Sequence, residues 1–517
     1  MDKLIKEIIT NTSKFKRFWK NEILSNKVVY LSLFIILILG FVARVYRAGD
    51  LMGFYYDQGR DALVIWRLWH EGRPFLIGPV TGLAGIFLGP FYYYLIAPFY
   101  LLGGGNPVYP AVFLAFITVC GVFMLYYLGW KFHSRITGLI AAVIGSFSFY
   151  LVLAGRWLSN PTPIMATSML FLYSLWMIIR GGSRNWWIVT ALLIGISLQL
   201  ESASAVFYLP IFIVFIIWQR KKLPGLKTLS YSGLIFFATL LPQILFNFRH
   251  DNLIINNFKR VLIEEQSFRL DFWQVLETRL NYFWQVFYSK LFMENKDLAA
   301  FFTLISAVLI ISRINSKKDF LPVKLLLLFN IVPMIGYILF QGNFGNIYDY
   351  YMTGYYFPLI LLFSIGMGFA WNKFLGKPVV VMFLILFCNI HVPALKNYLF
   401  SDTDGKHNIT LGNEIQAVNW VFDDAKDLNK FKVDVYVPPV IPHSYDYLFL
   451  WQGTQRCGES LCGLIKDGET EYIYALYEVD PPHPERLDAW MKKIENWTIM
   501  NYKTQFGGVS VEKRKVL

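Results

Sequence analysis

The segment FYYDQGRDAL, residues 54–63, places two carboxylates and a guanidinium just after the first long apolar run of the chain. Residues three and four positions apart are neighbours on a helix surface, so Asp57, Arg60 and Asp61 share one face if this segment is helical. A carboxylate can take the proton of an attacking hydroxyl, and a guanidinium can hold a phosphate through two hydrogen bonds. Charges near a membrane are costly, so we interpret this cluster as a candidate active site.

The composition assigns the chain to the integral membrane proteins. It is 56% hydrophobic and only 16% charged, with a mean hydropathy of +0.44. The run at 28–45 is long enough to cross roughly 30 Å of hydrocarbon. It is too long for the core of a signal peptide and no small-residue cleavage site follows it, so we expect it to remain as an anchor. The net charge of +13 does not indicate a nucleic-acid partner, because the basic residues fall in short clusters between apolar runs.

These basic clusters predict the orientation of the chain. The segment 1–27 is expected to stay in the cytoplasm, so that the first span carries residues 54–63 to the extracytoplasmic side. Each later cluster is predicted to lie in an inner loop; they contain Lys131, Arg180, Lys221, Lys317 and Lys373.

Residues 28–396 are predicted to form an all-α polytopic membrane domain of about 11 to 12 transmembrane helices. Inner and outer loops alternate as predicted only if segment 87–105 does not cross the membrane fully. Its Gly, Pro and Tyr content suits a re-entrant or interfacial segment. A full crossing is the alternative, and it would place the basic residues 131–135 outside. The apolar stretches after the first span lie at 108–130, 136–154, 162–180, 186–200, 205–218, 229–248, 297–312, 322–340, 353–371 and 378–396.

An odd number of crossings leaves residues 397–517 outside the cytoplasm, and their length suits a small domain. Their mixed pattern predicts an extracytoplasmic α/β domain. Helices are expected near 411–428, 443–451 and 485–494, and strands at 432–439, at 471–478 and from there to the end of the chain.

The four cysteines fall into two kinds. Cys457 and Cys462, in CGESLC, are expected to form a disulfide in an oxidising compartment. A metal site is less favoured, because no further Cys or paired His lies at ligand spacing. Cys120 and Cys388 lie within apolar runs and are expected to be small buried hydrophobes.

Further polar side chains are predicted at the outer ends of the spans. For each one alone, a charged end reaching water or an aromatic belt at the interface is a sufficient explanation. Their convergence on one side of the membrane instead favours a site that holds a lipid-linked phosphate while it activates a second substrate. The candidates are Arg156, Glu201, Arg249, His250, Tyr350 and Tyr351.

Several segments, in this order and spacing, resemble the bacterial multispanning glycosyltransferases related to the protein O-mannosyltransferases and the lipid A aminoarabinose transferase, which have the GT-C fold. The resemblance extends over roughly 28–396 and implies inverting transfer from a polyprenyl-phosphate sugar to an acceptor hydroxyl on the extracytoplasmic side. The segments are YYDQGRDA, EGRPFLIGPVTGLAGIFLGPFYYYLIAPFYLLGG, GWKFHSRITGLIAAVI, GRWLSNPTP and LLPQILFNFRHDN.

The resemblance also implies roles for individual residues. Asp57 matches the acidic residue of the first loop, the usual catalytic base of the family. The protein O-mannosyltransferases usually follow that Asp with Glu, where this chain has Gln58, and close relatives often have His at the position of Glu201. We therefore expect Asp61 and Glu201 as supporting acids. Donor-phosphate ligands are expected among Arg60, Arg156, Arg249 and His250, and substrate contacts among Tyr56, Tyr350 and Tyr351.

No cofactor is expected. The oligosaccharyltransferase branch holds a divalent metal with acidic pairs, but the outer loops of the membrane domain show no D-x-D or E-x-D. Arg, His and Tyr can stabilise a phosphate leaving group instead. A divalent metal remains the alternative.

Two other classes of function compete. A transporter would have polar groups near the midplane, often in repeated halves, and this sequence shows no such repeat. A non-catalytic membrane binding protein is the third reading. The expected partners are membrane lipids, a polyprenyl-phosphate-linked sugar donor and a lipid, glycan or protein acceptor. Release of free polyprenyl phosphate would distinguish the enzyme from both alternatives.

The segment 272–288 has apolar residues at helical spacing, with Glu277, Arg279 and Asn281 largely away from that stripe. This pattern predicts an amphipathic helix in the outer interface. An ordinary packed helix within a loop domain is the alternative.

Overall fold

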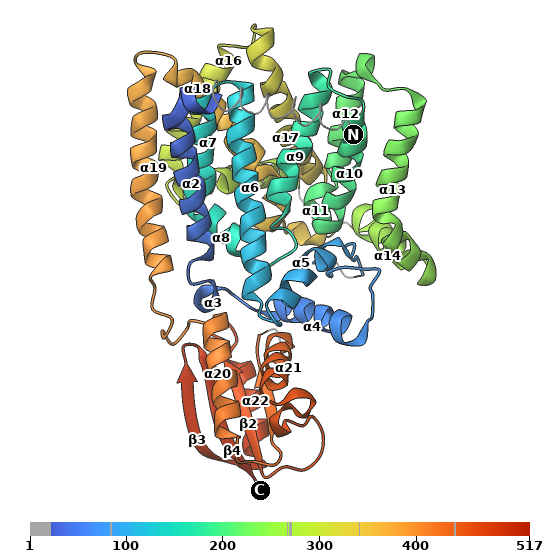
Figure 1. Cartoon of the computed structure of the whole chain (residues 1–517), viewed down its shortest axis with the longest axis vertical. Coiled ribbons are helices and arrows are strands. Elements are labelled where there is room, and N and C mark those ends of the chain that lie inside the picture. Colours follow the sequence, from blue (N-terminus) through green and yellow to red (C-terminus); the bar gives the residue numbers. More distant parts are fainter. Residues whose placement is uncertain (1–21, 83–84, 266, 268–270, 341, 439–440) are drawn as a thin grey trace, which may run out of the picture.

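The computed structural model describes residues 22–517 except 83–84, 266, 268–270, 341 and 439–440. A bundle of apolar helices carries a smaller α/β unit at one end (Figure 1). Most of the predicted cytoplasmic segment 1–27 lies outside the described residues. The helices of the first part are α2 (Lys27–Val45), α3 (Ala48–Leu51), α4 (Tyr56–Glu71), α5 (Phe91–Leu102), α6 (Val108–Phe132), α7 (Arg135–Phe147), α8 (Phe149–Arg156), α9 (Ile164–Ile179), α10 (Asn185–Leu200), α11 (Ser202–Ala205), α12 (Tyr208–Trp218), α13 (Leu226–Arg249), α14 (Leu253–Lys259), α15 (Phe272–Phe292), α16 (Lys296–Ile311), α17 (Lys317–Leu339), α18 (Thr353–Trp371) and α19 (Gly376–Leu399).

Within the described residues, six helices are long and apolar enough to cross a membrane: α2, α6, α13, α17, α18 and α19. The pair α7 and α8, bent by 63° at its break, adds a seventh if it counts as one span. Several other apolar helices are shorter than a bilayer core, so the count of 11 to 12 crossings stays a prediction. At 1.5 Å per residue α5 is about 18 Å long, too short to cross. It lies beside α4 at one end of the bundle (Figure 1), an arrangement that favours the interfacial interpretation of segment 87–105.

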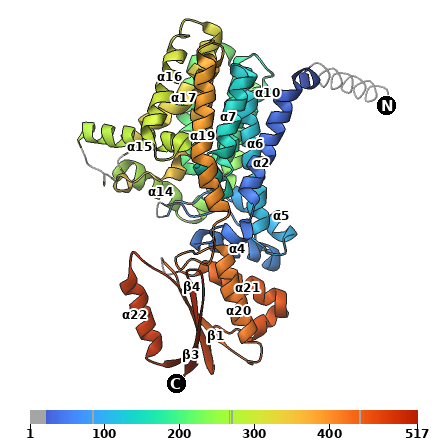
Figure 2. The same cartoon turned by 90° about the vertical axis from the view of Figure 1, so that its left-hand side faces the viewer.

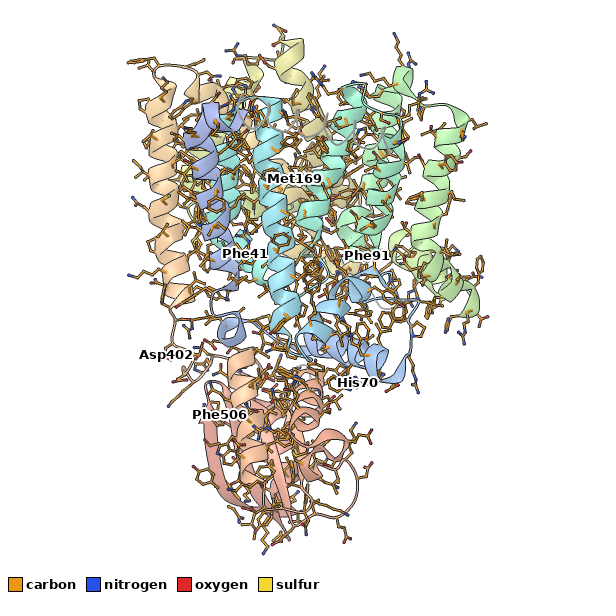
Figure 3. The ribbon with its side chains drawn as sticks, viewed as in Figure 1. Phe41, His70, Phe91, Met169, Asp402 and Phe506 are labelled. Carbon is orange, nitrogen blue, oxygen red and sulfur yellow. A yellow bond between two sulfur atoms is a disulfide. The ribbon has the colours of Figure 1, made fainter. Side chains whose placement is uncertain are left out.

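The centre of the bundle is α18, which is apolar on all sides and almost completely buried. A helix of this composition must lie either in a protein core or against lipid. Its small residues let neighbouring helices approach closely: Gly366 faces Ser306 of α16 and Gly368 faces Thr137 of α7, with no room for a Cβ at either position. Met169 of α9 is among the buried side chains of the bundle (Figure 3).

The break between α7 and α8 is held by polar side chains from other helices. Arg44 of α2 is fully buried and donates to the carbonyls of Gly145 and Ser146, at 2.8 and 3.1 Å. His391 of α19 accepts a hydrogen bond from the backbone N–H of Phe149 at 3.0 Å. Backbone groups freed by a helix break need such partners when water is excluded. The apolar stretch predicted at 136–154 therefore forms two helices, α7 and α8, rather than one.

The C-terminal part is a four-stranded sheet in the order β1-β2-β4-β3, with β1 parallel to β2 and the other pairs antiparallel. The central strand β2 is buried along nearly its whole length, and the Thr410 side chain caps the start of helix α20. Each predicted element is present, and all lie within a few residues of the expected bounds except α21, which extends six residues beyond the predicted end at 451. They are α20 (Leu411–Asp424), β1 (Lys432–Tyr436), α21 (His443–Cys457), β2 (Tyr472–Glu478), α22 (Pro484–Glu495), β3 (Thr498–Phe506) and β4 (Val509–Val516).

Cys457 and Cys462 form a disulfide just after α21. Cys120 and Cys388 are free, and both are exposed on the outside of the helix bundle, so the prediction that they are buried in protein was wrong. A residue of an apolar span can face lipid as well as the core, and hydropathy does not distinguish the two.

The C-terminal part packs on α4 through α21 (Figure 1). The backbone of His443 lies so close to Gly59 that no Cβ fits at that position of α4. Tyr447 and Trp451 of α21 also donate hydrogen bonds to the carbonyls of Gly105 and Gly104. Helix α4 is therefore held between the bundle and the C-terminal sheet.

Helix α15 lies across the bundle rather than along it (Figure 2), and Phe272 and Trp273 at its start are exposed. This arrangement agrees with an interfacial helix. However, Arg279 is 2% exposed and donates to the carbonyl of Gly345 at 2.6 Å. A residue that the pattern places away from the apolar stripe is thus buried as well, because its guanidinium binds loop carbonyls.

Candidate active site

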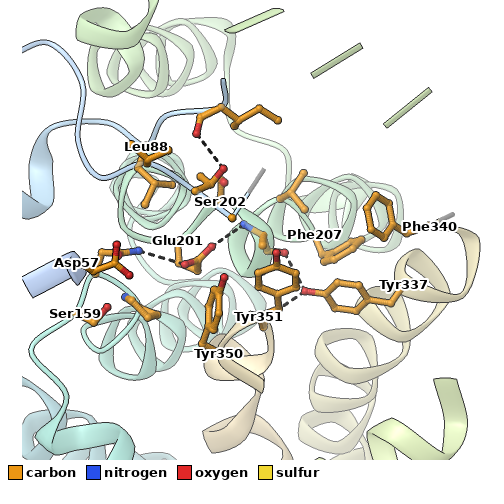
Figure 4. A pocket seen from close by; sticks show the side chains of 18 of the residues that line it. Asp57, Leu88, Ser159, Glu201, Ser202, Phe207, Tyr337, Phe340, Tyr350 and Tyr351 are labelled. Carbon is orange, nitrogen blue, oxygen red and sulfur yellow. Dashed lines mark hydrogen bonds between the residues drawn. The ribbon is translucent and has the colours of Figure 1, made fainter. Parts of the chain in front are cut away.

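A cavity of about 590 Å³ lies where α4, the junction of α10 and α11, the end of α17 and the turn before α18 meet. Figure 4 shows Asp57 and Glu201 at one side of it and a group of tyrosines at the other. Among the described residues its polar lining includes Asp57, Arg60, Ser159, Asn160, Glu201, Tyr350 and Tyr351. The structure thus brings together side chains from segments nearly 300 residues apart in sequence.

The start of α4 fixes the position of Asp57. Gln58 accepts a hydrogen bond from the backbone N–H of Tyr55 at 3.0 Å and donates to the carbonyl of Leu158 at 3.1 Å. It therefore caps the helix and ties it to the loop after α8. Gln58 is buried, so at this position, where the protein O-mannosyltransferases usually have Glu, the chain uses a neutral structural amide rather than a second acid.

Arg60 lies between two carboxylates of its own helix. Its guanidinium is 2.8 Å from Asp57 and 2.7 Å from Asp61. Asp61 is 4% exposed and also accepts a hydrogen bond from the hydroxyl of Tyr93 at 2.9 Å, whereas the Asp57 side chain is 55% exposed and lines the cavity. Burial raises the pKa of Asp61 to about 6, and Arg60 opposes this shift. Asp57 is thus the accessible acid, and Asp61 holds Arg60 in place.

Glu201 provides the second carboxylate of the cavity. It follows α10 directly and accepts hydrogen bonds from the backbone N–H of Ala203 at 3.1 Å and from Asn160 at 3.2 Å. The side chain is buried, and none of the ion pairs among the described residues includes it. A buried carboxylate with only two neutral donors keeps acceptor capacity for donors of a bound molecule.

The remaining wall is aromatic and apolar. Tyr350 packs edge-on against Trp157 with ring centroids 6.1 Å apart, and the hydroxyl of Tyr337 donates to the carbonyls of Ala203 and Tyr351 at 3.0 and 3.1 Å. Away from the carboxylates the lining is almost wholly apolar and includes Val206, Phe207, Phe258, Leu339 and Phe340. The cavity therefore has one polar and one apolar end.

Three of the predicted phosphate ligands lie elsewhere. Arg156 is buried at the end of α8, where it donates to the carbonyls of Ala43 and Tyr46, both at 3.0 Å. Arg249 and His250 end α13 on the outside of the bundle, and the His250 ring stacks on Phe246. Arg60 is the one cation that lines the cavity within the described part of the chain. Tyr56, Tyr350 and Tyr351 do line it.

Some lining residues were not predicted. Trp157, Ser159 and Asn160 lie in GRWLSNPTP, where a polar cluster interrupts apolar runs, so the sequence contains a signal for them. Tyr337 lies within an apolar run, and nothing in its neighbourhood distinguishes it from a core tyrosine.

A metal ion in the cavity would need several protein ligands close together. Among the residues that the structure describes, no three His, Cys, Asp or Glu side chains gather closely enough to bind one. Asp57 faces a guanidinium and Glu201 is bound by amide donors, so we derive no step through a metal.

The bundle of apolar helices and the cavity at one end of it define a polytopic membrane protein. Residues 88–246 match the family described as dolichyl-phosphate-mannose-protein mannosyltransferase. This region contains the loop after α8 and Glu201 but not Asp57. No characterised protein sequence gives a significant match over the chain.

Solved structures show the same architecture at low sequence identity. ArnT from Cupriavidus metallidurans in the apo state matches with a TM-score of 0.60 at 11% identity, over 95% of this chain and 98% of that one. The same protein bound to undecaprenyl phosphate gives 0.56 at 11% identity, over 94% and 98%. The oligosaccharyltransferase AglB from Archaeoglobus fulgidus, in complex with an inhibitory peptide and a dolichol-phosphate, gives 0.51 at 11%, over 96% and 74%. The predicted resemblance to GT-C glycosyltransferases is confirmed.

Proposed function

We propose that the protein is a membrane glycosyltransferase that moves a sugar from a polyprenyl-phosphate donor to an acceptor hydroxyl, with inversion at the anomeric carbon. The observation that carries this proposal is the form of the cavity. An accessible carboxylate and a guanidinium stand at its polar end, and an apolar end continues from them. A sugar phosphate suits the first part, and the first isoprene units of the lipid suit the second.

In this mechanism Asp57 accepts the proton of the acceptor hydroxyl. The oxygen forms a bond to the anomeric carbon while the bond from that carbon to the phosphate oxygen breaks on the opposite face. Polyprenyl phosphate leaves with the electron pair. Arg60 stabilises the charge on the phosphate with N–H groups that its two aspartates leave free, and it orients Asp57.

The other lining residues hold the sugar. Glu201 accepts hydrogen bonds from sugar hydroxyls, and the rings of Tyr350 and Tyr351 cover its apolar face. Asp61 positions Arg60 and does not reach the substrate. We assign no contact with the phosphate to Arg156, Arg249 or His250, because they lie outside the cavity.

The topology belongs to the same proposal. The active site and residues 397–517 lie on the extracytoplasmic side, the N-terminus lies in the cytoplasm, and about eleven crossings connect them.

The reaction requires no metal, so a chelator leaves the rate unchanged.

The experiment is a transfer assay with purified protein in liposomes and a panel of radiolabelled polyprenyl-phosphate sugars. We expect one donor to release free polyprenyl phosphate and to label an acceptor. A transporter would move the label across the membrane without cleaving it. Binding without cleavage for every donor would reject the enzyme.

A further inference from the structure

A second cavity, of about 380 Å³, opens at the other end of α9 from the active site. Residues just before α9 line the first cavity, and Tyr173, Trp176 and Arg180 at its end line the second. Helix α9 has 16 residues and is therefore about 24 Å long, so the two cavities lie near opposite ends of the bundle. Tyr127 and Lys131 of α6 also line the second cavity.

The wall of this cavity is aromatic and its rim is cationic. The Lys131 ammonium is 5.4 Å from the ring centroid of Tyr127, and the Arg180 guanidinium is 5.9 Å from that of Trp176. No carboxylate lines the cavity among the described residues. Glu22, an acid close to Lys131, binds Arg135 at 2.7 Å. The cavity therefore has a positive potential with no acid on its wall to offset it.

Beyond this cavity, exposed apolar side chains continue along the outer surface of α6 and α9. Phe123 of α6, one turn before Tyr127, is 44% exposed, and Leu170 of α9, one turn before Tyr173, is 39% exposed. The rings of Phe123 and Tyr127 stack with centroids 6.5 Å apart. A free anion would satisfy the two cations but would leave these apolar side chains uncovered, whereas an acyl chain would lie along them.

We propose that this cavity binds the phosphate headgroup of an anionic phospholipid, in the leaflet opposite the active site. Lys131 and Arg180 hold the phosphate, the tyrosines and Trp176 surround the glycerol, and an acyl chain lies over Phe123 and Leu170. Basic pockets between spans are a common form of anionic lipid site, with each Lys or Arg contributing substantially to binding.

The test compares Lys131→Gln/Arg180→Gln with Lys373→Gln/Lys377→Gln, which removes one charge from the loop between α18 and α19 and one from the first turn of α19, both outside the cavity. Each protein is reconstituted in nanodiscs of phosphatidylcholine with a minor fraction of phosphatidylglycerol, and retained lipid is counted by native mass spectrometry. We expect the first variant to retain phosphatidylglycerol on the order of tenfold less, and the control to behave as the wild type. The conservative variant Lys131→Arg/Arg180→Lys keeps both charges and should restore retention.

Equal retention in both glutamine variants would overturn the proposal. Thermal unfolding with inorganic phosphate alone distinguishes the two sources of the anion. If phosphate raises the midpoint as much as phosphatidylglycerol does, the site takes a free anion and the lipid assignment is wrong. If the glutamine variant does not fold, the test depends on the charge-preserving variant. A folded Lys131→Arg/Arg180→Lys protein that retains less phosphatidylglycerol than the wild type would then refute the assignment.

Discussion

Replacement of Asp57 by Asn is the most direct perturbation of the proposed base. The amide has nearly the same shape but cannot take a proton at neutral pH. General base catalysis is worth roughly a hundredfold to ten-thousandfold, so we expect transfer to fall by on the order of a hundredfold or more, about 2.7 kcal/mol or more in the barrier. The fold should remain, because an ion pair whose carboxylate is 55% exposed contributes at most about 1 kcal/mol.

The structure also indicates that Arg60 would stay in place in this variant. Its bond to Asp61, at 2.7 Å, and the bond from Tyr93 to Asp61 are independent of Asp57. A loss of rate would therefore report the missing base rather than a displaced guanidinium.

Asp50 offers a matched control. It forms the same kind of ion pair three residues from its partner, with Arg47 at 3.0 Å, and its side chain is 57% exposed. It does not line the cavity. The assay is the initial rate of polyprenyl-phosphate release at saturating donor, with the unfolding midpoint measured in parallel. We expect Asp50→Asn to keep the normal rate. A well-folded Asp57→Asn protein with the normal rate would refute the reasoning and move the base to Glu201, the other carboxylate that lines the cavity.

Three further outcomes follow from the domain after α19. A reporter that fluoresces only in the cytoplasm, fused to Leu517, should stay dark; bright cells would contradict the orientation and the extracytoplasmic active site. Mass spectrometry of unreduced protein should find Cys457 and Cys462 protected from alkylation, and free thiols at both would contradict the disulfide. Burial raises the pKa of Glu478 to about 7, and it raises the pKa of the neighbouring Glu414 well above the ordinary 4.5. The unfolded chain loses these protons at lower pH than the folded protein does, so the stability should fall as pH rises from about 4.5 through about 7. Unfolding midpoints measured across this range should show the fall, and Glu478→Gln should make it smaller. An unchanged pH dependence in that variant would contradict the role of Glu478.

The sequence predicts best where one periodicity is unambiguous. The strands and helices of the C-terminal sheet were predicted to within a few residues, because each has a clear period and clear turn residues. Among the apolar helices the same reasoning finds long runs, but it cannot tell α18, which is buried in protein, from α13, which is largely exposed. The mean hydropathy of the two helices is similar, because lipid and a protein core are both apolar.

The candidate site shows the same limit. Asp57, Arg60 and Glu201 were predicted and do share one cavity, because their segments end at the same face of the bundle. Arg249 ends a span at the same face in the predicted topology but lies outside the cavity, since α13 stands at the edge of the bundle (Figure 1). The predicted topology gives the depth of a residue in the membrane. The position of that residue around the bundle depends on how the helices pack, and no single segment determines this packing.

The contact between Gly59 and His443 has a consequence for the order in which the protein matures. The two residues are about 380 positions apart, and a ribosome adds roughly 5 to 20 residues per second. Helix α4, which carries Asp57, therefore leaves the ribosome tens of seconds before α21 exists to pack on it. The cavity lining is already synthesised by Tyr351, but α4 gains its packing partner α21 only when synthesis is nearly finished. Until then a chain that already lies in the membrane lacks the contact that holds this helix from the side opposite the bundle.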